Sequence, residues 1–121
     1  MSPIENKISV ESPIGFADSN IVRLLRFEDT LIVTVNTWND ETLEVSFLGV
    51  IGFRESMAFE LSDLVRSNEI GQFGEWCLSR AYEGNISNGE MKFQFLDVDY
   101  EVAIEIIAKG VQIRIVKGNQ H

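Results

Sequence analysis

Alternating and continuous apolar positions divide the chain into short segments with the character of β-strands. Residues 22–28 and 31–38 are rich in β-branched and aromatic side chains and are separated by a two-residue turn, which predicts a hairpin. Residues 42–54 alternate between apolar and polar side chains and then become continuously apolar around Gly49 and Gly52. Because glycine inside a strand often marks a bend, this segment is expected to form either one long bent strand or two strands joined by a kink.

One or two helices are expected to be inserted near residues 57–82, where the period of the apolar positions changes. Apolar residues from Leu61 to Val65 recur at helical spacing and predict a helix near residues 60–69. A less regular pattern predicts a second helix near residues 73–82.

Three further strands are predicted in the C-terminal part, at residues 90–96, 100–108 and 111–117. Short connections between strands imply antiparallel neighbours, so the expected fold is α+β: a mostly antiparallel sheet of N-terminal and C-terminal meanders with the helices between them. The length suits a single domain over residues 1–121. Residues 1–20 hold both prolines and lack a regular period, so they are expected to form a loosely docked N-terminal arm.

The stretch between Phe93 and Ile107 contains several acidic residues in an otherwise apolar run. Residues of one parity share a face of a strand, and from Leu96 onward the even positions are apolar and the odd positions mostly acidic. Upstream of Leu96 the parity is reversed, which requires a turn or a bulge between Asp97 and Tyr100. In either case the even positions are expected to face the core. The exposed side is expected to carry Asp97, Asp99, Glu101 and Glu105.

The composition is that of a soluble globular protein, with 45% hydrophobic and 24% charged residues and a formal net charge of −9. Fourteen of the nineteen acidic residues, but only four of the ten basic ones, lie between Asp40 and Glu105. A negative field repels nucleic acid and anionic membranes and attracts basic partners. Solubility alone is the alternative explanation.

Several classes of function are not supported by any pattern in the chain. A calcium-binding loop counted from Asp97 would need glycine at its sixth position and glutamate at its twelfth, where Val102 and Ala108 stand. Transition metals prefer histidine and cysteine, and the chain has only Cys77 and His121. Acids on one exposed face share the same solvent, so nothing gives them the separate acid and base roles of a hydrolase. We therefore expect no metal, no cofactor and no enzymatic activity.

The sequence favours a cytoplasmic protein. A single cysteine permits no internal disulfide. The N-terminal segment lacks the basic start and apolar block of a secretion signal, and the apolar stretches are far shorter than the ~20 residues of a membrane helix.

A second group of candidate binding residues surrounds Trp38. Exposed tryptophan beside charged residues is common at the centre of protein interfaces. The alternative is that Trp38 is the last inward residue of its strand. The acidic residues nearby are Asp40, Glu41 and Glu44.

The stretches TWNDETLEVSFLGVIGF and FQFLDVDYEVAIEIIAKGVQIRI resemble the small acidic immunity proteins that bacteria encode beside polymorphic or contact-dependent inhibition toxins. The resemblance covers roughly residues 20–116 and lies in the layout of strands, helix and acidic positions. It implies a cytoplasmic, non-enzymatic protein that binds a cognate toxin domain, often a basic nuclease, and occludes its active site. The alternative is a small acidic bacterial adaptor or housekeeping binding domain without a toxin partner. On grounds of charge and of the exposed tryptophan expected beside it, the predicted partner-binding residues are Asp97, Asp99, Glu101, Glu105, Asp40, Glu41, Glu44 and Trp38.

Overall fold

The structure is a computed structural model that describes residues 7–56, 60–82 and 89–116. Within these ranges one antiparallel sheet accompanies a single helix, which confirms the expected α+β fold with a helix inserted in the middle of the chain. The strands are β1 (Ile8–Ser9), β2 (Ser19–Phe27), β3 (Thr30–Asn36), β4 (Thr42–Leu48), β5 (Gly52–Glu55), β6 (Glu60–Ser67), β7 (Met91–Asp97), β8 (Val102–Ala108) and β9 (Gly110–Val116), and the helix is α1 (Gly71–Ala81).

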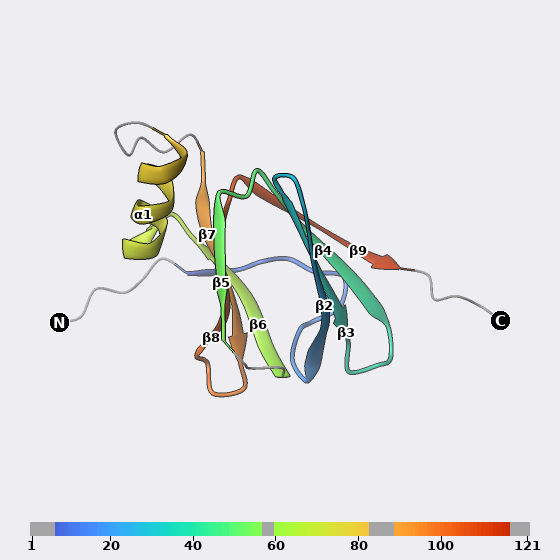
Figure 1. The fold of residues 1–121 in the computed structure, drawn as a ribbon. Helices are drawn as coiled ribbons and strands as arrows, with labels where there is room; N and C mark the ends of the chain where they lie inside the picture. Colours follow the sequence, from blue (N-terminus) through green and yellow to red (C-terminus); the bar gives the residue numbers. More distant parts are fainter. Residues whose placement is uncertain (1–6, 57–59, 83–88, 117–121) are drawn as a thin grey trace.

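The sheet folds over into two layers (Figure 1). Its strand order is β5-β8-β7-β6-β2-β3-β4-β9, with β1 beside β6. The first four strands form one layer and the last four form the other. The chain bends sharply from one layer to the other at two places, from β4 to β5 and from β8 to β9. Before and after these bends the same two segments are paired, as β4 with β9 in one layer and as β5 with β8 in the other. Residues 42–54 are thus two strands joined by a kink, at which Gly49 adopts a left-handed φ of 65°.

The hydrophobic core lies between the two layers. Alternate residues of β3 and β4 point inward and meet the inward side chains of β6, β7 and β8. Phe47 packs edge-on against Phe93 and Phe95, with ring centroids 5.3 and 5.9 Å apart. The segment before β2 also joins the core, because Phe16 is buried and its ring lies 5.6 Å from that of Phe95.

The helix predicted near residues 60–69 is wrong, because residues 60–67 form strand β6. The pairing of β6 with β7 shifts register between Leu61 and Asp63, which marks an irregularity of the bulge type. An extra residue at this point lets Leu61 and Leu64 both face the core although they are three positions apart. A bulged strand therefore produces the same apolar spacing as a helix. The second predicted helix is present as α1.

Helix α1 packs closely on the outer face of the layer formed by β5 and β8. A Cβ atom added to Gly52 would lie 2.4 Å from the Sγ of Cys77, and one added to Gly74 would lie 3.2 Å from Ile107. Both glycines therefore allow the helix to approach the sheet. With 11 residues, α1 is too short to cross a membrane, and the described part of the chain has no longer helix.

We expect Cys77 to be unreactive toward a thiol reagent in the folded protein and to react fully after unfolding in urea. Burial raises the pKa of this thiol, and the negative charge of Glu105 raises it further. Both effects lower the population of the reactive thiolate at neutral pH. Release of the chromophore from an aromatic disulfide reagent would measure the two rates. Rapid stoichiometric labelling of the folded protein would contradict the buried position of Cys77.

Candidate functional site: an acidic end of the two-layer sheet

The pairing registers bring the ends of several strands into one row across the sheet. Antiparallel partners alternate in direction, so the turns and strand starts beyond this row all lie at the same end of the molecule, which is the lower end in Figure 1. The row crosses five strand-to-strand steps of about 4.8 Å, or about 24 Å measured along the folded sheet. The row runs from β8 to β4 through the pairs Val102–Leu96, Asp97–Leu61, Leu61–Ser19, Asn20–Asn36 and Asn36–Thr42.

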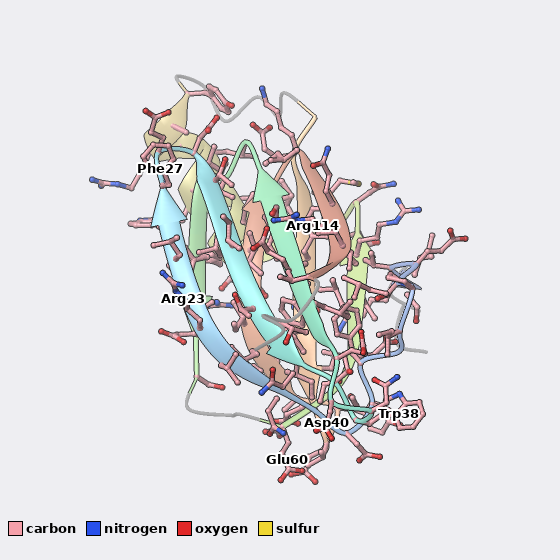
Figure 2. All side chains as sticks on the ribbon, turned by 90° about the vertical axis from the view of Figure 1, so that its right-hand side faces the viewer. Arg23, Phe27, Trp38, Asp40, Glu60 and Arg114 are labelled. Carbon is pink, nitrogen blue, oxygen red and sulfur yellow. The ribbon has the colours of Figure 1, made fainter. Side chains whose placement is uncertain are left out.

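This end of the molecule is strongly acidic. Its turns contain no lysine or arginine, and none of its carboxylates forms an ion pair with another described residue. All but the half-buried Asp97 are exposed. Figure 2 shows two of these acidic residues, Asp40 and Glu60, together with Trp38 at the bottom of the molecule. We define the acidic end by its carboxylates, which are Asp18, Asp40, Glu41, Glu60, Asp97, Asp99 and Glu101.

The β3–β4 hairpin presents Trp38 and Asp40 at its tip. The amide of Asp40 donates a hydrogen bond to the carbonyl of Thr37 (3.1 Å), and the amide of Thr37 donates to the carbonyl of Glu41 (2.8 Å). Asp40 has a left-handed φ of 62°, as the last residue of a three-residue hairpin loop requires. Trp38 is 65% exposed and projects from the tip rather than ending the inward face of its strand (Figure 2).

The β7–β8 hairpin has the same geometry. The amide of Tyr100 donates to the carbonyl of Asp97 (2.9 Å), and the amide of Asp97 donates to the carbonyl of Glu101 (2.8 Å). The Asp97 carboxylate accepts hydrogen bonds from the amides of Asp99 (2.8 Å) and Glu101 (3.0 Å), so it holds the turn together. Asp99 and Glu101 make no comparable side-chain bond among the described residues. They are therefore the carboxylates of this hairpin that remain available to a partner.

The change of parity in this stretch has two structural causes. One is the turn at residues 97–101, and the other is a register shift between Phe95 and Leu96 in the pairing of β7 with β8. The prediction that Tyr100 and Val102 face the core is wrong, because they are 74% and 37% exposed. Tyr100 occupies the left-handed position of the loop, with φ 61°, and belongs to the turn rather than to a strand. Of the even positions from Leu96 onward, Leu96, Ile104 and Ile106 are buried as predicted.

The prediction that Glu105 lies on an exposed face with the other acids is wrong. Glu105 is only 5% exposed, because the outer face of β8 is covered as well as its inner face. Its carboxylate accepts a hydrogen bond from the amide nitrogen of the buried Gln94 (2.7 Å) and lies 3.2 Å from the guanidinium of Arg54. Glu105 therefore contributes to the interior of the fold and is not accessible to a partner.

Glu44 also lies away from the acidic end. It is on the outer face of β4, where Arg114 of β9 donates two hydrogen bonds to one carboxylate oxygen, at 2.8 and 3.0 Å. Figure 2 shows Arg114 on this open sheet face, well above Trp38 and Asp40. The negative charge of Glu44 is thus largely compensated by Arg114.

Two carboxylates of the acidic end, Asp18 and Glu60, and the neighbouring Tyr100 were not predicted from the sequence. Asp18 directly precedes β2 and Glu60 begins β6. These two strands meet through a pairing between residues distant in sequence, so no local pattern predicts where the two carboxylates lie. Tyr100 could have been found by comparing TWNDE with DVDYE, since both carry a side-chain acceptor first, Asn or Asp third and Glu fifth. This shared pattern is that of the same three-residue hairpin loop.

The chemical groups of the acidic end are carboxylates, most of them exposed, beside exposed aromatic side chains. The described residues contain no cluster of His, Cys, Asp and Glu that could hold a metal ion. What the end offers is uncompensated negative charge with two exposed aromatic side chains, Trp38 and Tyr100, one on each hairpin tip. Comparisons with protein-family models, curated proteins and solved structures found no match, so the function is argued from these residues.

Proposed function

We propose that this chain is a toxin-neutralising immunity protein, which binds a cognate basic toxin domain through the acidic end and occludes its active site. The observation that carries the proposal is the collection of exposed carboxylates from separate parts of the chain at one end, beside Trp38 and Tyr100. A toxin that cleaves nucleic acid needs positive charge in its cleft to hold phosphate. A rigid surface of carboxylates is complementary to such a cleft.

Charge and aromatic contact would act at different stages of binding. Uncompensated carboxylates steer a basic domain toward the acidic end and raise the association rate. Exposed aromatic side chains such as Trp38 and Tyr100 can then fill pockets on the partner and slow dissociation.

Both hairpin tips are already held in shape before any partner binds. The loop of residues 37–41 is closed by two backbone hydrogen bonds and by the Thr37 hydroxyl, which accepts from the amide of Glu41 at 3.0 Å. The loop of residues 97–101 is closed in the same way by the Asp97 carboxylate. A preformed surface loses little conformational entropy on binding, which favours tight association.

The first test is whether a toxin domain binds at all. The tagged protein, expressed in its native host, is used to capture partners, and a toxin domain encoded beside its gene is purified in an inactive form for direct titration. We expect a complex with that domain and protection of cells that express the active toxin. If the neighbouring gene encodes no toxin and no basic toxin domain is captured, the proposal is wrong.

Replacing Asp99 and Glu101 together by lysine is expected to weaken toxin binding about 10- to 100-fold and to reduce its dependence on salt. The substitution places positive charge opposite a basic cleft and removes attraction that salt screens. Titration calorimetry at several salt concentrations would measure both effects.

A matched control changes the same net charge at the other end of the molecule. Glu28 and Asp29 are exposed acids in the β2–β3 turn, beside Phe27, which lies opposite Trp38 in Figure 2. Replacing both by lysine should leave affinity nearly unchanged. Equal weakening by the two double variants would show that only net charge matters and would remove the acidic end from the proposal.

A further inference from the structure

The outer edge of strand β9 has no partner strand in the described part of the chain. β9 is the last strand in the sheet order and pairs with β4 along seven residues on one side only. The strand at the other end of the sheet, β5, has four residues. An unpaired edge of seven residues exposes backbone donors and acceptors that can pair with another strand.

The core is also incompletely covered along this edge. The inward residues of β9 are half-buried or exposed, with Ile115 37% exposed, whereas their cross-strand partners on β4 are fully buried. Next to the start of β9 lies a hollow of about 440 Å³. Its apolar lining includes Ile8, Val10, Met91 and Val111. The outer edge of β9 thus combines unpaired backbone groups with apolar side chains that are incompletely covered.

We propose that this edge binds a second copy of the chain, through antiparallel pairing of the two β9 strands about a twofold axis at Ile113. In this register Val111 faces Ile115 of the second copy, so every inward pair is apolar. On the outer face Gln112 lies opposite Arg114 of the second copy, and no like charges meet. The strand is therefore complementary to itself, as a twofold interface requires.

Other registers of the same pairing are less favourable. An axis at Arg114 would place two arginines directly opposite each other, and like charges at that spacing are destabilising. An axis at Gln112 would pair Arg114 with Gly110, which offers no side chain. The pattern of side chains along GVQIRIV selects the axis at Ile113.

The charge distribution also favours a second copy in this orientation. Each chain carries a formal net charge of −9, and much of it lies at the acidic end, whereas β9 contains no acidic residue. An antiparallel twofold arrangement turns the two acidic ends in opposite directions. The dimer would therefore minimise repulsion between them and leave both free. The inference does not depend on what the acidic end binds.

Sedimentation velocity over a wide range of concentration tests the dimer. We expect the unaltered protein to dimerise. Gln112→Arg should weaken the dimer about tenfold and Gln112→Glu should strengthen it by a similar factor. Residue 112 lies opposite Arg114 of the second copy, and this pair occurs twice across the axis, so each change acts twice. Gln112 is exposed, so neither variant should alter the circular dichroism spectrum. Asn36→Arg is the matched control, because it adds the same charge to the same outer face on the interior strand β3, where Asn36 is exposed and lies opposite the uncharged Asn20 and Thr42.

Cross-linking tests the position of the axis. Residues opposite each other in an antiparallel pair have Cα atoms about 4.5–5.5 Å apart, within reach of a disulfide. Ile113→Cys should therefore give a disulfide-linked dimer under mild oxidation, and Thr34→Cys should not. The proposal is overturned by a monomer at all concentrations, by a dimer that Asn36→Arg weakens as much as Gln112→Arg, or by equal cross-linking of the two cysteine variants. None of these outcomes would affect the proposed toxin binding.

Discussion

Replacing Glu105 by lysine is expected to destabilise the folded protein by roughly 3–5 kcal/mol. The carboxylate is buried between the amide of Gln94 and the guanidinium of Arg54. Lysine would bring two positive charges together and would leave the amide donor of Gln94 without its acceptor. Because Glu105 is only 5% exposed, solvent can compensate little of either loss. Urea denaturation followed by circular dichroism would measure the change.

Two further variants separate burial from charge. Glu101→Lys makes the same charge change four residues earlier, on the exposed hairpin, and should alter the free energy of unfolding by no more than about 0.5 kcal/mol. Glu105→Gln keeps the shape and can still accept from Gln94, so its effect should be smaller than that of lysine. If Glu105→Lys and Glu101→Lys had the same small effect, Glu105 would have to be exposed, as its alternation with apolar residues suggests.

Replacing Phe95 by alanine is expected to cost about 3–5 kcal/mol of stability. Phe95 is fully buried and its ring packs against those of Phe16 and Phe47. It therefore connects the segment before β2 with both layers of the sheet. Alanine would leave a cavity that the paired strands around it cannot close. The same urea titration measures the loss.

Phe27 provides a control with the same chemistry. It lies at the end of β2 and is 67% exposed, so Phe27→Ala should change stability by less than about 0.5 kcal/mol. A loss for Phe27→Ala as large as that for Phe95→Ala would mean that the outer face of β2 is covered in solution.

The acids of this protein fall into three environments that its sequence does not distinguish. Asp99 and Glu101 lie exposed on a hairpin tip, Glu44 is paired with Arg114 on an open sheet face, and Glu105 is buried. All four stand in segments with apolar neighbours. Of these four, only Asp99 and Glu101 are exposed and without an ion pair among the described residues, so only these two belong to the proposed binding surface.

Local sequence was sufficient to predict most strands, the turn between β2 and β3, a bend around Gly49 and Gly52, and the sheet-rich fold class. Each of these depends on residues close together in the chain: β-branched runs, turn residues and glycine at a bend. The antiparallel arrangement followed as well, because short connections leave consecutive strands little alternative.

Contacts between distant segments decided the rest. Apolar spacing reports which side chains prefer burial, but a bulge changes the spacing, and so Leu61 and Leu64 indicated a helix where the chain forms β6. Parity separates the two faces of β8, but whether the second face is also covered depends on other elements, and Glu105 is buried for that reason. The acidic end arises in the same way, because Asp18, Glu60 and the two hairpin tips meet only through strand pairings between residues far apart in the chain.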